Sequence, residues 1–182
     1  MNLVRTFVLG LVLSAVVSSC SSTQKASTAV TEAVNEVDSV YPAWYKKAGF
    51  LAESTQYTAY HTAIAADSNK AISVAEDYAR TKLESSLADK FETVRSQMAS
   101  NGKSVAQQRD FIILLRNAHQ QIVEEAQIQV SEASFDENHY RGFAAARIST
   151  SSLLKLMKKG FSQNAFYWKT FRTSRAYRAE FH

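Results

Sequence analysis

TQYTAYHTAIAA (residues 55–66) runs into DSNKAISVAEDYARTKLESSLADKFETVRSQM (67–98), and the hydrophobic period changes between the two stretches. The first is rich in Thr, Tyr, Ala and Ile, residues that favour a β-strand. In the second, apolar residues recur every three or four positions, as on one face of a long helix; they are Ile72, Ala75, Ala79, Leu83, Leu87, Phe91, Val94 and Met98. Residues 67–69 offer capping side chains, and Asn101 and Gly102 are typical of a helix end. This region therefore predicts a strand followed by a helix over 70–100.

A second helix is predicted to begin at Ser104. Ser104 and Gln107 have the spacing of a capping box, in which side chains bond the free backbone N–H groups of a helix start. The apolar residues that follow are expected to face the core; they are Phe111, Leu114, Leu115, Ala118 and Ile122. Because the run FIILL is apolar almost all round, we expect this helix to be more buried than the first.

Residues 127–149 return to a period of two and predict a hairpin of two strands. The stretch 136–138, Asp-Glu-Asn, supplies residues typical of its turn. The apolar phase changes between Val130 and Ala133, which indicates a bulge or bend there. Phe143 breaks the alternation of the second strand.

A short helix is predicted from about Ser151, with Gly160 as its stop and with Leu153, Leu154 and Met157 as its apolar residues. The order is then strand, long helix, helix, strand, strand, helix. It predicts an α+β fold in which helices pack on a small antiparallel or mixed sheet of at least three strands. The alternative, an all-helical bundle, requires residues 55–66 to be helical or disordered.

The N-terminus has the layout of a secretory signal. It carries one charge at Arg5, then an apolar run to Val17, and the run is shorter than the about 20 residues that a spanning helix needs. Val17, Ser18 and Ser19 resemble a bacterial lipobox, which implies cleavage before Cys20, the only cysteine, and its lipidation. An ordinary cleaved signal is the alternative.

This organisation divides the chain into four parts. Residues 1–19 are expected to be the signal peptide, and residues 20–40 the lipidated N-terminus with a tether of about 25 Å reach. Residues 41–161 are expected to form the α+β domain. It opens with YPAWY (41–45), where the only proline lies among three aromatic residues, and we expect this segment to pack on the domain as an N-terminal clasp. Residues 162–182 remain as a basic, aromatic helix.

No catalytic motif is present in the sequence. The histidines are scattered without the spacing of a metal site; they are His61, His119, His139 and His182. A glycine-rich phosphate loop and a nucleophile elbow are both absent. We therefore expect a protein that is not an enzyme and that holds neither cofactor nor metal. The alternative is an envelope enzyme or a carrier of a small ligand or lipid, with a site assembled only in the fold.

The charge distribution points to the C-terminus. Residues 20–154 hold 13 basic and 16 acidic residues, whereas residues 155–182 hold 7 basic residues against Glu180 alone. Aromatic residues interleave with these cations, so the sequence predicts an amphipathic helix that offers a basic face to an anionic lipid, lipopolysaccharide or an acidic protein. The candidate contact residues are Trp168, Lys169, Arg172, Arg175 and Arg178. The alternative is that the aromatic residues complete the core and the arginines are merely solvated. Nucleic acid is not an expected partner, because lipidation places the chain outside the cytoplasm.

Four features of the chain resemble the LPP-twenty family of bacterial envelope lipoproteins, some of which are associated with flagellar basal structures. They are the lipobox cysteine, the Pro-x-Trp of YPAWY, the strand TQYTAYHTAIAAD and the helix AISVAEDYARTKLESSL. The resemblance runs from Pro42 to about Leu87 and continues loosely to Ile148. Tyr60 and His61 stand where the family strand commonly has a glycine. The resemblance implies a compact α+β domain that self-associates or docks to other envelope proteins, and Ser21 fits sorting to the outer membrane, facing the periplasm.

Overall fold

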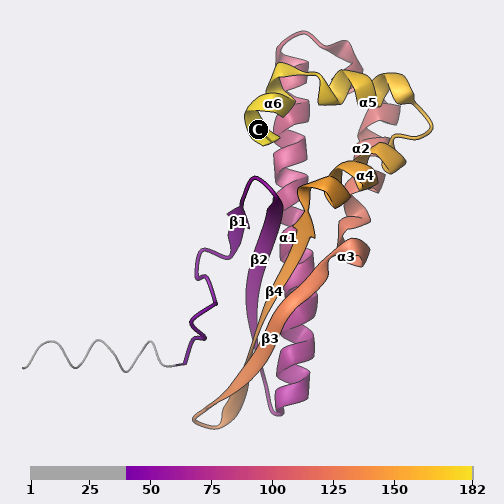
Figure 1. Ribbon diagram of the computed structural model, residues 1–182. Coiled ribbons are helices and arrows are strands. Elements are labelled where there is room, and N and C mark those ends of the chain that lie inside the picture. The colour runs from indigo at the N-terminus through magenta and orange to yellow at the C-terminus, as the bar shows by residue number, and fades with distance from the viewer. Residues whose placement is uncertain (1–39, 182) are drawn as a thin grey trace, which may run out of the picture. The chain divides into compact units, whose positions relative to one another are not determined.

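The structure of this protein is a computed structural model that describes residues 40–181, so the predicted signal peptide and Cys20 lie outside the described residues. The α+β class is confirmed (Figure 1). The strands are β1 (Phe50–Ala52), β2 (Gln56–Ala65), β3 (Gln127–Asp136) and β4 (His139–Ser149). The helices are α1 (Ser68–Ser100), the 3₁₀ turn η1 (Ser104–Gln107), α2 (Arg109–Gln120), α3 (Ile122–Glu125), α4 (Thr150–Gly160), α5 (Ala165–Arg172) and α6 (Arg175–Phe181).

The four strands form one antiparallel sheet in the order β1-β2-β4-β3. β2 pairs with β4 along its whole length, from Gln56 opposite Ser149 to Ala65 opposite Tyr140. The strand predicted at 55–66 is thus confirmed, and the all-helical alternative is wrong. The short edge strand β1 was not predicted, because its three residues are too few to show the alternation of apolar and polar residues that indicates a strand.

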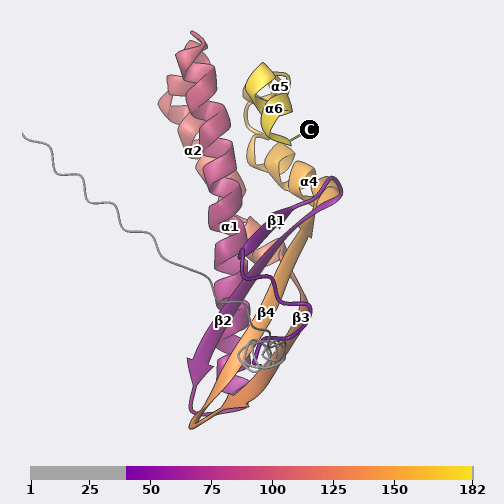
Figure 2. The same cartoon turned by 90° about the vertical axis from the view of Figure 1, so that its left-hand side faces the viewer.

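Helix α1 lies along one face of the sheet and continues past its end (Figures 1 and 2). Asp67 caps it, since its Oδ1 accepts a hydrogen bond from the Lys70 N–H at 2.8 Å. The predicted core face is confirmed except at its first position, where Ala71 is buried and Ile72 is only half-buried. Small residues make the contact between helix and sheet; they are Ala71, Ala75 and Ala79 on α1 and Ala59, Ala63, Gly142, Ala144 and Ala146 on the strands.

The predicted capping box at Ser104 is wrong. Residues Ser104–Gln107 form the 3₁₀ turn η1, and α2 begins only at Arg109, with Gln108 at its N-cap and no side-chain cap bond. The tight turn buries Val105 and Ala106 beneath the end of α1. Burial of these two apolar side chains outweighs the capping bond that an earlier helix start would have made.

Helix α2 is also less buried than its composition predicted. Its buried residues are Phe111, Leu115 and Ala118, while Leu114 is half-buried and Ile113 is 43% exposed. The helix packs on α1 and α4 with one side only. Its other side faces solvent, so an all-round apolar run does not mean all-round burial.

The β3–β4 hairpin turns at Glu137 and Asn138, as predicted, with Glu137 in the left-handed region at φ 55°. The bulge is present too, but it lies between Ile128 and Val130, just before the predicted place. Phe143 breaks the alternation because it points to the sheet face away from α1.

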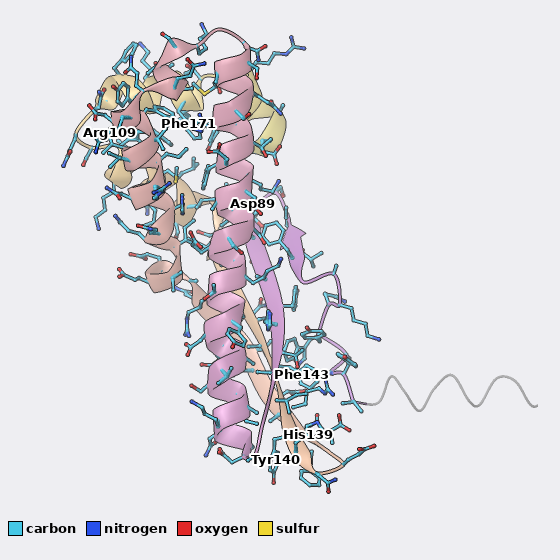
Figure 3. All side chains as sticks on the ribbon, turned by 180° about the vertical axis from the view of Figure 1, so that it is seen from behind. Asp89, Arg109, His139, Tyr140, Phe143 and Phe171 are labelled. Carbon is cyan, nitrogen blue, oxygen red and sulfur yellow. The ribbon has the colours of Figure 1, made fainter. Side chains whose placement is uncertain are left out.

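The N-terminal clasp covers that outer face. The rings of Tyr41 and Tyr45 lie 5.5 Å and 5.3 Å from the ring of Phe143, and Tyr45 also contacts Tyr60 at 6.1 Å. Phe143 is fully buried as a result. The predicted clasp is therefore present, and it gives the outer face of the sheet its own small aromatic core (Figure 3).

Helix α4 begins one residue earlier than predicted and buries Leu156 where Leu154 was expected. Ser149 caps it by accepting a hydrogen bond from the Ser152 N–H at 3.0 Å. Gly160 is the last residue of the helix and makes a close contact there, since a β-carbon at this position would lie 2.3 Å from the Ala118 Cβ of α2.

The C-terminal segment predicted as one helix forms two. α5 and α6 are separated by Thr173 and Ser174, and the Ser174 Oγ accepts a hydrogen bond from the Tyr177 N–H at 3.0 Å. Both helices pack on the core near the end of α1 (Figure 1). The break turns α6 back toward α1, which places Tyr177 and Phe181 against Phe91 and Tyr57.

Candidate anion-binding surface

The three histidines within residues 40–181 do not gather into a site. His119 Nδ1 lies 2.6 Å from Glu84 Oε1 and joins α2 to α1, and the ring of His61 contacts Tyr78 at 5.1 Å. His139 lies 3.6 Å from Asp136 in the hairpin, and His182 is outside the described residues. Within residues 40–181, no group of three histidine, cysteine or carboxylate side chains is arranged to hold a metal ion.

Most aromatic side chains of α5 and α6 pack on the core, whereas their basic side chains and Phe166 are exposed. Asn164 starts α5 by accepting a hydrogen bond from the Tyr167 N–H at 3.1 Å. Phe171 and Tyr177 are buried, and Trp168 is half-buried with its ring 6.0 Å from that of Phe161. All four predicted cations are exposed; we call Lys169, Arg172, Arg175 and Arg178 the basic surface.

The basic surface is not neutralised from within the described part of the chain. None of its four side chains forms an ion pair with a carboxylate of residues 40–181. Glu180, the only acidic residue on these two helices, lies 2.6 Å from Lys90 of α1. By contrast Arg95 is engaged with Glu92, and its hydrogen bonds lower the pKa of that carboxyl group. The cations of α5 and α6 are therefore available to an external anion.

Four of the five candidate residues meet around one hollow. It has a volume of about 410 Å³ and is lined by Trp168, Lys169, Arg172, Thr173 and Arg178. Arg175 lies outside it and faces the end of α1, where it lines two further hollows together with Lys103. Lys103 was missed by the sequence analysis, because it lies about 70 positions before Arg175 and only the fold brings the two together.

Tyr177, next to this surface, stays uncharged. Burial raises the pKa of its phenol to about 12, Tyr57 adds to the rise, and the positive charge of Arg172 acts in the opposite direction. Because the phenol remains neutral below that pKa, it gives the arginines no counter-charge at physiological pH. The site is thus a set of strong, exposed hydrogen-bond donors that suits carboxylate or phosphate groups.

Neither a membrane-spanning helix within residues 40–181 nor a match to known proteins was found, as follows. None of the helices in residues 40–181 has the length and apolar character needed to cross a membrane. Comparison with protein-family models, with curated proteins and with solved structures finds no match to this chain.

Proposed function

We propose that this chain is a non-catalytic lipoprotein of the bacterial envelope, anchored at Cys20 to the outer membrane on its periplasmic side. Its folded domain has a structural or interaction role, alone or in a multimeric assembly, and contacts an anionic envelope component through the basic surface. The resemblance to the LPP-twenty family and the lipobox-like N-terminus favour this class. The observation that carries the proposal is the unpaired basic surface on a well-packed part of the domain.

A C-terminal segment with only a structural role needs no particular arrangement of its cations. Packing of α5 and α6 on the core uses Phe171 and Tyr177, which are buried. It does not require Lys169, Arg172 and Arg178 to surround one hollow, where like charges repel one another. An anionic partner removes that repulsion, so binding explains an arrangement that packing leaves unexplained.

Lipidation of Cys20 is the first expected result. Mass spectrometry of the chain expressed in a Gram-negative host should show a mature N-terminus at Cys20 that carries acyl chains, because several chains are needed for a durable anchor. The Cys20→Ser variant should keep its signal peptide or lose the acyl mass, and should leave the membrane fraction. A mature chain that begins elsewhere, without lipid, would contradict the anchor.

Removal of three arginines tests the basic surface. The variant with Arg172, Arg175 and Arg178 all changed to Gln should bind anionic vesicles up to about 150-fold more weakly, since each basic residue contributes up to about 1 kcal/mol there. Binding of the wild type should also weaken as salt rises. The matched control changes three other exposed cations, Lys155, Lys158 and Lys159 of α4, to Gln. Equal binding by both variants and the wild type, at unchanged melting temperatures, would contradict the proposed contact.

A second role is favoured by the hollows beside Lys103 and Arg175. They offer room for a small anionic ligand as well as a surface contact. This role corresponds to a ligand-binding lipoprotein rather than an enzyme.

A further inference from the structure

Two adjoining hollows lie between the end of α1 and the helices α5 and α6. Their volumes are about 550 Å³ and about 610 Å³. Both are lined by Lys103, Ser174 and Arg175, so they form one continuous depression, which we call the Lys103–Arg175 groove. Each hollow alone has the size of a typical small-molecule site, which occupies roughly 300–1,000 Å³.

The polar lining of the groove selects anions. Lys103, Arg175 and Lys169 supply three positive charges, and no Asp or Glu lines either hollow. The hydroxyl groups of Ser104 and Thr170 lie among these cations, while those of Thr173 and Ser174 donate to the backbone carbonyls of Lys169 and Phe171. Arginine binds phosphate through two parallel hydrogen bonds, and lysine acts as a point charge beside it. The combination suits a phosphate group.

The groove also has exposed apolar surface, which a bare phosphate ion would leave uncovered. Ala179 of α6 is exposed in one hollow, over the buried Met98 and Ala176. Val105 and Phe166 line the other, and Phe166 is 65% exposed. An exposed phenylalanine beside a cationic groove has apolar surface to bury against a ligand. The ligand that satisfies both linings carries a phosphate at one end and a hydrocarbon chain at the other.

We propose that the Lys103–Arg175 groove binds the phosphate headgroup of a single anionic phospholipid, with one acyl chain against Ala179 in one hollow and the other against Phe166 in the second. The phosphate lies between Lys103 and Arg175, the two cations that line both hollows. This site deepens the proposed contact with an anionic component and rests on it, because it names the component as a lipid. It also makes Lys103, outside α5 and α6, a binding residue.

The test uses the full chain and a short-chain phosphatidylglycerol below its micellar concentration, with calorimetry as the readout. The Lys103→Gln/Arg175→Gln pair should lose at least tenfold in affinity. The control pair Lys155→Gln/Lys158→Gln removes the same charge from exposed positions of α4 that line none of these hollows, and should lose less than threefold. Glycerol phosphate, which lacks the acyl chain, should bind at least tenfold more weakly than the lipid.

An independent variant guards against a folding artefact. Ala179→Glu places a carboxylate at an exposed position of the groove, so it should abolish lipid binding while its melting temperature stays unchanged. Equal losses in the groove pair and the control pair, equal affinity for glycerol phosphate, or displacement of the lipid by a polyglutamate peptide would each overturn the lipid site. These outcomes leave the lipid anchor at Cys20 and a general anionic contact untouched, so the two proposals fail separately.

Discussion

Phe171→Ala is expected to lower the free energy of unfolding by about 4 kcal/mol, the usual cost of removing a fully buried phenyl ring. Phe171 is 0% exposed. Its ring centre lies 6.1 Å from that of Phe91, 5.9 Å from those of Phe111 and Phe161, and 5.4 Å from that of Tyr177. The substitution therefore opens a cavity where α1, α2, α4, α5 and α6 meet (Figure 3). Urea unfolding followed by far-ultraviolet circular dichroism measures the loss.

The neighbouring residue is the matched control. Arg172 is exposed, and Arg172→Gln should change the unfolding free energy by no more than about 0.5 kcal/mol. A loss below about 1 kcal/mol for Phe171→Ala would mean that α5 and α6 unfold separately from the rest of the domain. The different expected effects of Phe171→Ala and Arg172→Gln also mean that binding is best tested with charge substitutions. Deleting α5 and α6 would damage the core, whereas charge substitutions would not.

The two readings of the C-terminal segment are therefore compatible. Phe171 and Tyr177 complete the core, as the structural alternative held, while Phe166 and the cations are exposed. Solvation alone does not exclude binding, since a binding surface must be exposed before its partner arrives. The structure buries Phe171 and Tyr177 and leaves Arg172, Arg175 and Arg178 exposed.

The long helix was predictable because its signal is repeated many times. Eight apolar positions at helical spacing predict both the helix and the side of it that is buried. Predicting Ile72 in place of Ala71 as the first buried residue changes neither conclusion. That error has a physical cause. At its start α1 packs on Ala63 and Gly142 of the sheet. The small side chain of Ala71 fits against these residues, and the larger side chain of Ile72 points away from them.

Single-residue signals were less reliable, because tertiary packing competes with them. The capping box at Ser104 is worth about 1 kcal/mol, which is less than the burial of Val105 and Ala106 supplies. The aromatic Phe143 looked like an exception within its strand until the clasp supplied its partners, Tyr41 and Tyr45, from about 100 positions away. Lys103 escaped notice for the same reason, since its place beside Arg175 depends on how the end of α1 meets α6.

Close approach between backbone segments was another feature that local sequence did not locate. Tyr60 and His61 stand where a glycine is common in the family that this strand resembles, and the ring of His61 contacts that of Tyr78 of α1. The close approach occurs on β4, where Gly142 pairs with Ala63 and faces the start of α1. Nothing in the hairpin sequence distinguishes this glycine from one in a turn, because its partner lies about 70 residues earlier.

Gly142→Ala is accordingly expected to destabilise the protein by about 3 kcal/mol or more, since overpacking against backbone has no inexpensive relief. A β-carbon at residue 142 would lie 2.2 Å from the carbonyl oxygen of Ala71, 2.3 Å from its carbonyl carbon and 2.7 Å from the Ile72 nitrogen. These are main-chain atoms of the first turns of α1, so a rotamer change cannot remove the clash. The helix must move off the sheet, which also loosens Ala71 and Ala75, and the melting temperature should fall by roughly 6–12 °C.

The same change at Gly102 separates this clash from other effects of replacing glycine. Gly102 has φ +76° and no atom within 4 Å of an added β-carbon, so Gly102→Ala brings backbone strain without a clash and should cost about 1–2 kcal/mol. Thermal unfolding of the two variants beside the wild type gives the comparison. If Gly142→Ala melts no lower than Gly102→Ala, the start of α1 does not lie tightly on β4. We expect Gly142→Ala to have the lower melting temperature. We also expect its lipid binding to be unchanged, because the groove lies at the other end of α1, beside Met98 and Lys103.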